Sequence, residues 1–353
     1  MLSRRAISRL WSVILSAVAL LPLACDRGKD PIGPAPTVTG RVSGSTGGER
    51  LRCAANDFDD RDDRDTDDHG LTRVEVFEFG DFALYAPAGV TTTRGLILAL
   101  GGPDTRGFVT GKPLGAPIPA VEASLQTLGQ EFRTLASTCG LALLGTSRAA
   151  LTNGPASDQL LRDALQTAAA LSGHPELPTT PLLVYAISGG GPQGSGFTAR
   201  NPEQVAGLFM KVPVGVSSLT SGDALRVPTY MVQAELDAFV NNAVTTAAFE
   251  GNRGAGALWA RAMERGVPHH SLSAVQRQAT IDWMSTILSL RLPARRSHPL
   301  RRIAETRGWL GNSVTGEAAR WADYRGDPAV ASWLPSRSTA MDWERLVAAA
   351  PIP

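Results

Sequence analysis

The stretch Tyr185-Ala186-Ile187-Ser188-Gly189-Gly190-Gly191 decides the fold of this 353-residue chain. It lies between an apolar run that is typical of a buried strand and a segment predicted to be a helix. A serine on a sharp turn from a strand to a helix has strained backbone angles, and the residues two positions away must be small so that the turn can close. Ala186 and Gly190 occupy these two positions. The stretch therefore predicts that Ser188 is a nucleophile at the end of a buried strand.

Strands and helices alternate on both sides of this stretch. Short apolar runs predict buried strands at 96–100, 141–144, 182–187, 205–214 and 229–234. Helical spacing predicts helices at 121–135 and 158–171, a helix ending near 200, and a strongly amphipathic closing helix at 271–290. An antiparallel hairpin with its turn at Gly80-Asp81 precedes them. This alternation predicts an α/β fold with a mostly parallel sheet and helices on both faces.

A carboxylate and a histidine follow the serine along the chain. Asp237 comes just after the last predicted strand, at the sheet edge where such folds assemble their sites, and Glu235 is the reserve candidate for the acid. His269 and His270 lie in a loop before the closing helix. We expect one of them, preferably His269, to act as the general base. A metal site on the two histidines is not expected, because no further ligands stand at suitable spacing.

The motif around Ser188 resembles the nucleophile elbow of the α/β-hydrolase family, with Ala186 where the family most often has Gly. The order Ser, Asp, His along the chain is also the order of that family. The resemblance covers roughly residues 71–290. It implies an α/β-hydrolase fold and a Ser-Asp-His triad that hydrolyses carboxylic esters through an acyl-enzyme, without a cofactor. The expected substrate is a small-molecule or polymeric ester.

The same resemblance implies an oxyanion hole made of backbone N–H groups. Gly189, at the start of the helix, is one expected donor. The second donor is expected from the loop at 101–107, where the family often has His-Gly and this chain has two glycines. Direct alignment puts Pro103, which has no N–H, at the usual donor position. We therefore expect Gly102 or Asp104 to supply the second donor, or the hole to be built otherwise.

The N-terminal residues predict an exported protein. Basic residues precede an apolar run from Trp11 to Leu21, which is shorter than the roughly 20 residues that span a bilayer. Cys25 follows Leu21-Pro22-Leu23-Ala24, which resembles the lipobox of bacterial lipoproteins. We expect a signal peptide at 1–24 and a lipid on Cys25 that anchors the protein to a membrane of the bacterial cell envelope. Ordinary cleavage nearby is the alternative.

Residues 25–70 are rich in Gly, Pro, Ser, Thr and Asp, and they predict a disordered tether. Eight of the Asp residues lie within 56–69, but this run lacks the Gly and the terminal Glu of an EF-hand loop, so we interpret it as a solvated charge run. Cys53 and Cys139 are expected to form one disulfide in an oxidising compartment, or else to remain unpaired. A formal net charge of +1 gives no basic excess for nucleic acid.

The domain is expected to span 71–292, followed by a C-terminal extension at 293–353. Four of the seven tryptophans lie in this extension, namely Trp309, Trp321, Trp333 and Trp343. Their spacing favours a helical cap packed on the domain over an aromatic surface that binds substrate.

Two other functions stay open at this stage. One is a binding lipoprotein of the cell envelope that keeps the fold without useful catalysis, since a fold alone does not confer activity. The unusual loop at 101–107 supports it, and a Ser-Gly-Gly-Gly stretch is also typical of a flexible loop or a phosphate cradle. The other is an amidase or peptidase, because the acyl-transfer machinery is shared.

Overall fold

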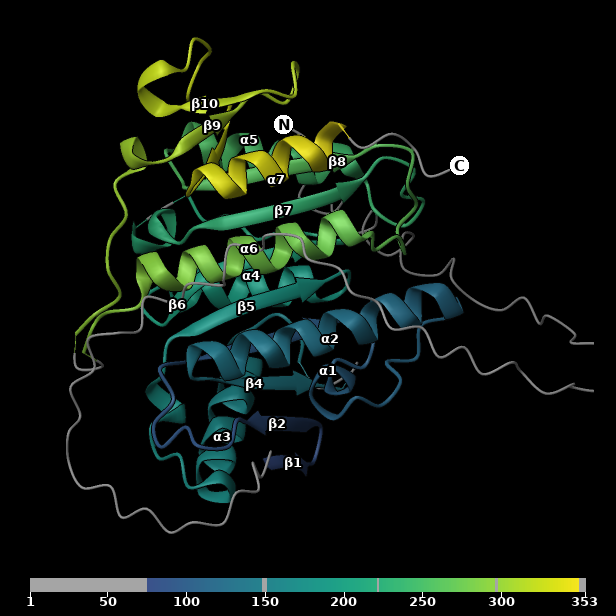
Figure 1. Cartoon of the computed structure of the whole chain (residues 1–353), viewed down its shortest axis with the longest axis vertical. Helices are drawn as coiled ribbons and strands as arrows, with labels where there is room; N and C mark the ends of the chain where they lie inside the picture. Colours follow the sequence, from purple (N-terminus) through teal and green to yellow (C-terminus); the bar gives the residue numbers. More distant parts are fainter. Residues whose placement is uncertain (1–74, 148–150, 221, 296–297, 349–353) are drawn as a thin grey trace, which may run out of the picture. The chain divides into compact units, whose positions relative to one another are not determined.

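The structure is a computed structural model that describes residues 75–147, 151–220, 222–295 and 298–348 (Figure 1). These residues fall within one compact unit, Arg50–Pro353. The predicted signal peptide, the tether, Cys25 and Cys53 lie outside the described residues. Within them, no helix has the length and apolar character needed to cross a lipid bilayer.

An eight-stranded sheet forms the centre of the described part, with the strand order β1-β2-β4-β3-β5-β6-β7-β8. β1 pairs with β2 and β2 pairs with β4 in antiparallel fashion, and the remaining neighbours pair in parallel. The strands are β1 (Glu75–Phe79), β2 (Phe82–Ala86), β3 (Gly95–Gly101), β4 (Leu141–Thr146), β5 (Leu182–Ile187), β6 (Val205–Lys211), β7 (Thr229–Ala234) and β8 (Trp259–Glu264). The predicted mostly parallel sheet is confirmed.

Helices cover both faces of the sheet, because successive side chains of a buried strand point to opposite faces. On β3, Ile97 packs in one core cluster and Leu98 in the other. The Ile97 face is covered by α1 (Arg106–Thr110), α2 (Pro119–Cys139), α6 (Ala274–Arg291) and α7 (Arg337–Ala348). The Leu98 face is covered by α3 (Pro155–Ser172), α4 (Gly190–Arg200) and α5 (Asn242–Gly254).

The closing helix α6 differs from its prediction. It begins after Ser273, whose hydroxyl accepts the N–H of Gln276 at 3.0 Å. The sequence predicts a strongly amphipathic helix, yet the polar side chains of Gln276, Thr280 and Ser285 are buried together with the apolar ones. The reason is that α7 packs on α6, so the helix is covered on more than one side.

The C-terminal extension contains strands as well as a helix. Three short strands, β9 (Trp309–Gly311), β10 (Ala318–Arg320) and β11 (Ser332–Leu334), form a separate antiparallel sheet before α7. The sequence predicts helix alone, because three-residue strands are too short to show a period of two. Trp343 of α7 is buried and donates its Nε1–H to the carbonyl of Arg261 in β8 at 2.7 Å. The extension therefore shares the core of the domain.

Before the C-terminal extension, the helices α1 and α5 and the strand β8 were not predicted from the sequence either. Helix α5 buries mostly Thr245, Asn252 and Arg253 besides Phe249, so it lacks the apolar stripe that identifies a helix. Cys139, the last residue of α2, takes part in a disulfide. Because Cys53 lies outside the described residues, the pairing of Cys53 with Cys139 stays a prediction.

Candidate active site

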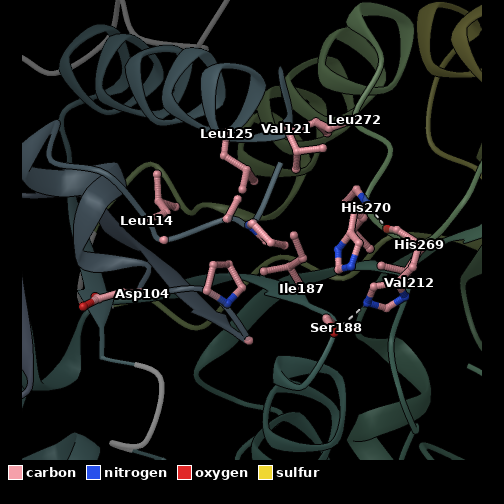
Figure 2. A pocket seen from close by; sticks show the side chains of 16 residues that line it. Asp104, Leu114, Val121, Leu125, Ile187, Ser188, Val212, His269, His270 and Leu272 are labelled. Atoms are coloured by element: carbon pink, nitrogen blue, oxygen red, sulfur yellow. Dashed lines mark hydrogen bonds between the residues drawn. The ribbon is translucent and has the colours of Figure 1, made fainter. Parts of the chain in front are cut away.

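Ser188 lies on the turn between β5 and α4 (Figure 2). Its φ of 53° is in the left-handed region, which residues other than glycine adopt only a few per cent of the time. The turn closes because Gly190 has no side chain: a Cβ atom there would lie 2.4 Å from the carbonyl oxygen of Leu100. Ala186 is similarly confined, since a Cβ atom on Gly194 would lie 3.0 Å from its methyl group. The local geometry is that of the predicted elbow.

A chain of hydrogen bonds joins the serine to a histidine and a carboxylate. Ser188 Oγ lies 2.8 Å from His269 Nε2, and His269 Nδ1 lies 2.7 Å from Asp237 Oδ2. An ionised carboxylate only accepts, so Nδ1 carries the proton and donates to Asp237. Nε2 is then the acceptor of the Ser188 hydroxyl proton. The side chain of Asp237 is fully covered and that of His269 is 6% exposed, which keeps both bonds away from competing water.

The carboxylate of Asp237 is held by the loop that carries it. Its Oδ1 accepts the N–H groups of Phe239 at 2.8 Å and Val240 at 2.9 Å, which leaves Oδ2 directed at His269. The reserve candidate Glu235 is occupied elsewhere. It bonds Arg265 Nη1 at 2.7 Å, and this hydrogen bond, with a further one from the Gly266 N–H, lowers the pKa of Glu235.

His270 lies beside the hydrogen-bond chain rather than in it. Its ring packs edge-on against His269, with 5.0 Å between centroids, and tilted against Phe239 at 5.3 Å. Burial lowers the pKa of His270, and the neighbouring His269 and Lys211 lower it further. These effects favour the neutral form of His270, whose ring forms part of the cavity wall.

Of the expected oxyanion donors, Gly189 lies at the N-cap of α4. The first N–H groups of a helix have no acceptor within it, and the positive end of the helix dipole favours an anion there. A methyl group on Gly102 would lie 3.5 Å from Ser188 Oγ and 3.8 Å from the nitrogen of Gly189. Gly102 thus borders the space between the nucleophile and this donor.

Of the alternatives left open for the second donor, the structure disfavours Gly102 and Asp104. The N–H of Gly102 donates to the carbonyl of Ile187 at 3.2 Å, and the N–H of Asp104 donates to the carbonyl of Leu114 at 3.0 Å. Both groups are therefore engaged, and Pro103 between them has no N–H. Gly102 contributes space rather than a hydrogen bond.

Lys211 is a functional candidate that the sequence reading missed. It ends β6, is 2% exposed, and its Nζ donates to the carbonyl of His269 at 3.1 Å. Burial lowers the pKa of Lys211 to about 8, against the opposing attraction of Glu264 and Asp237. The next residue, Val212, has a φ of 41°, which is a strained conformation for a β-branched residue. The available signal was a lysine inside the apolar run 205–214 in a chain with three lysines.

Ser188 and His269 open onto a cavity of about 270 Å³ (Figure 2). Its walls come from the loop after β3, from the first turns of α2, from the segments around Ser188 and Val212, and from the histidine loop. The large apolar side chains of the lining are Leu114, Val121, Leu125, Ile187, Val212 and Leu272. In the part of the chain that the structure describes, no three His, Cys, Asp or Glu side chains are grouped to hold a metal ion.

Neither a protein-family model nor a curated protein sequence matches the chain. Among solved structures, the chain is similar to an S-formylglutathione hydrolase from Agrobacterium tumefaciens, with a TM-score of 0.39 and 16% sequence identity. The match covers 59% of this chain and 89% of the hydrolase. It is also similar to TT1662 from Thermus thermophilus, with a TM-score of 0.42 and 16% sequence identity. This match covers 62% of the present chain and 100% of TT1662. A thermostable esterase from Pseudomonas putida matches with a TM-score of 0.42 and 15% sequence identity. This match covers 64% of the present chain and 84% of the esterase. The described residues themselves form a mostly parallel eight-stranded sheet with helices on both faces.

Proposed function

We propose that this protein is a serine hydrolase that cleaves carboxylic esters through a Ser188–His269–Asp237 triad. The observation that carries the proposal is the unbroken hydrogen-bond chain from Ser188 Oγ through His269 to Asp237, with distances of 2.8 and 2.7 Å. A nucleophile, a base within hydrogen-bond reach and a third group that orients the base are the requirements of nucleophilic acyl transfer. The elbow conformation of Ser188 presents its hydroxyl to the cavity.

In the first half of the reaction, His269 Nε2 takes the hydroxyl proton while Ser188 Oγ attacks the carbonyl carbon of the ester. Asp237 stabilises the imidazolium that forms. The carbonyl oxygen becomes an oxyanion near the Gly189 N–H at the start of α4. The imidazolium then gives its proton to the leaving alcohol oxygen, and the acyl group remains on Ser188.

In the second half, water replaces the alcohol. His269 takes a proton from the water as its oxygen attacks the acyl carbon, and a second tetrahedral intermediate forms. When this collapses, the imidazolium returns the proton to Ser188 Oγ and the carboxylic acid leaves. The enzyme is regenerated without a metal or a redox partner in the reaction balance.

The test uses a fluorophosphonate probe on the purified full chain, with mass spectrometry to locate the adduct and a chromogenic ester to follow turnover. We expect an adduct on Ser188 and loss of both labelling and turnover in Ser188→Ala. Ser218→Ala is the matched control, because Ser218 is exposed and bonds only Thr220. If the folded wild-type protein neither labels nor turns over esters, the proposal is wrong.

A second candidate function is a binding protein with little or no catalysis. The observation that favours it is the oxyanion side of the site, where the N–H groups of Gly102 and Asp104 are engaged. Removing a single donor from an oxyanion hole costs about 10²–10³-fold in kcat. A slow but measurable turnover that depends on Ser188 would support the enzyme, whereas tight ligand binding without turnover would support the binding protein.

We also propose that the protein is exported and anchored by a lipid on Cys25 in the bacterial cell envelope. The support is the N-terminal sequence and the disulfide at Cys139, since disulfides persist mainly in oxidising compartments. Incorporation of a labelled fatty acid in cells expressing the full chain, and its loss in Cys25→Ser, would test the anchor. Incorporation that persists in Cys25→Ser would contradict it.

A further inference from the structure

The cavity beside Ser188 is lined by apolar side chains of which several are buried, and two exposed apolar residues lie in the nearby loop that carries Asp237. Resting on the proposed function, we infer that the substrate is an ester with a short, uncharged, apolar acyl group and a larger apolar alcohol. The acyl group occupies the cavity lined by α2 and the loop before it. The alcohol extends over the exposed residues Leu236 and Phe239. The enzyme is selective for the acyl part and tolerant of the alcohol part.

The position of His269 decides which arm of the ester goes to which side. The leaving oxygen must lie within hydrogen-bond reach of His269 Nε2, because this atom donates the proton that completes the departure of the alcohol. The acyl arm must therefore extend from Ser188 away from His269. In Figure 2, Leu114 and Leu125 lie beyond Ile187 on that side.

The size of the cavity limits the acyl arm. Its volume of about 270 Å³ is just below the range of about 300–1,000 Å³ that is typical of sites for drug-sized ligands. At ~30 Å³ for each water molecule, it holds roughly nine water-sized groups. Because the ester group itself takes part of this space, an acyl chain of about four to six carbons fills it. Leu125 is 3% exposed and Leu114 is 2% exposed, so the far wall is backed by the core.

The charges around the cavity exclude an ionised acyl group. Asp104 is held by Arg106, whose Nε lies 2.9 Å from Oδ1 and whose Nη2 lies 2.5 Å from Oδ2. Lys211 is buried and donates to the carbonyl of His269. No other Lys or Arg is among the described residues that line the cavity. A carboxylate on the acyl arm would lose its hydration and share the cavity with the carboxylate of Asp104, while the lysine of the described lining already donates to the carbonyl of His269.

The alcohol side is open and apolar. Phe239 is 69% exposed and its ring centroid lies 5.2 Å from that of His269, while Leu236 in the same loop is 60% exposed. Both residues belong to the loop that holds Asp237, and the Phe239 ring lies against His269 and His270, where the alcohol leaves. Apolar surface next to the leaving-group position binds an apolar alcohol without enclosing it.

The acyl part is tested on the full chain with 4-nitrophenyl acetate, butyrate, hexanoate, octanoate and decanoate, by measuring kcat/KM. We expect a maximum at butyrate or hexanoate and a fall of at least about tenfold at decanoate, the order of effect that one methylene too many has in an apolar pocket. A 4-nitrophenyl ester whose four-carbon acyl arm ends in a carboxylate should react at least about a hundredfold more slowly than the butyrate.

Two variants in α2 distinguish the effect of filling the cavity from the general effect of adding a large side chain to the helix. Val121 and Ala123 are two residues apart on α2; Val121 lines the cavity, whereas Ala123 is exposed. Val121→Trp fills the cavity, so it should lower kcat/KM for hexanoate about tenfold or more and shift the optimum to acetate. Ala123→Trp should keep the chain-length profile of the wild type.

The alcohol part is tested with butyrate esters of ethanol and of 2-naphthol. Phe239→Ala should lower kcat/KM several-fold more for the naphthyl ester than for the ethyl ester, because only the larger alcohol covers the ring. Val314→Ala, which removes an exposed valine outside the cavity lining, is the control.

The outcomes separate this inference from the proposed function. Absence of the fluorophosphonate adduct and of all ester turnover overturns both. An adduct on Ser188 with kcat/KM that rises steadily to decanoate overturns the inference alone, as does a Val121→Trp variant that slows all chain lengths equally. An optimum at short acyl chains that Val121→Trp moves to acetate supports it.

Discussion

The proposed site uses side chains on one side of Ser188 and backbone N–H groups on the other. On one side, His269 and Asp237 act through their side chains and form a closed hydrogen-bond chain. On the other side, the expected donors are backbone N–H groups, and those of Gly102 and Asp104 are already bonded to Ile187 and Leu114. The functional group of a side chain is visible in the sequence, even though its surroundings change its pKa. A backbone N–H is available only if the local pairing leaves it free.

The largest expected effect comes from breaking the side-chain half of the site. His269→Ala removes the base that holds the Ser188 proton, so we expect kcat to fall by about 10⁴–10⁶-fold, as for other triads. His270→Ala should retain most of the activity, because His270 contacts the triad only through ring packing. Steady-state kinetics on a short-chain ester measures both. Equal losses in the two variants would contradict the assignment of the base to His269.

The acid gives the next effect. Asp237→Asn keeps the shape of the side chain but no longer stabilises the imidazolium and favours the wrong tautomer, so kcat should fall by about 10⁴-fold. Glu235→Gln is the matched control, because Glu235 is exposed and bonds Arg265 rather than His269. If kcat falls more in Glu235→Gln than in Asp237→Asn, then Glu235 is the catalytic acid and the assignment of Asp237 is wrong.

The backbone half is probed by Gly102→Ala. The added methyl group would lie 3.5 Å from Ser188 Oγ and 3.8 Å from the nitrogen of Gly189, in the space that the oxyanion needs. We expect kcat to fall by about 10²-fold, as when one oxyanion donor is lost. Gly251→Ala in α5, with nothing within 4 Å of the added atom, should keep full activity. Because alanine retains the backbone N–H, full activity of Gly102→Ala would mean that the space beside Gly102 is not used.

This comparison also explains how far the sequence could predict the molecule. The elbow turn and the proximity of Ser188, Asp237 and His269 were predictable because these residues stand in a recognisable order at the ends of predicted elements. The parallel sheet was predictable because its strands are continuous apolar runs. These signals lie in short stretches of sequence, so they can be recognised without knowledge of the fold.

The features that escaped prediction depend on contacts between distant segments. The N–H of Asp104 is engaged because the chain returns at Leu114 to offer a carbonyl, which residue types do not reveal. The polar residues of α6 are buried because the helix packs against α7 and α2 as well as against the sheet. Lys211 ends β6, and the next two strands of the sheet, β7 and β8, lead to Asp237 and Glu264, so only the assembled sheet brings these charges close.

The smallest expected effect on activity comes from Lys211. Its side chain donates a hydrogen bond to a backbone carbonyl, that of His269, so it combines a side-chain group with a backbone group. Lys211→Met removes this donor but keeps the length of the side chain. We expect kcat to fall by about tenfold, the equivalent of about 1.4 kcal/mol, because the histidine loop is held less firmly. Lys211→Arg retains a cation and should recover part of the loss.

The same lysine should make stability depend on pH, with a sign opposite to that of a favourable ion pair. Burial lowers its pKa from 10.5 to about 8, so between these values the unfolded chain binds more protons than the native protein. The free energy of unfolding therefore rises with pH across this window. Below pH 8 the full penalty of charging Lys211 is present, about 3 kcal/mol at 1.36 kcal/mol for each pKa unit. Lys211→Met should thus be more stable than the wild type in urea unfolding at pH 7, and the gap should narrow by pH 10. A wild type that is the more stable protein at pH 7 would show that the contacts of Lys211 outweigh its desolvation.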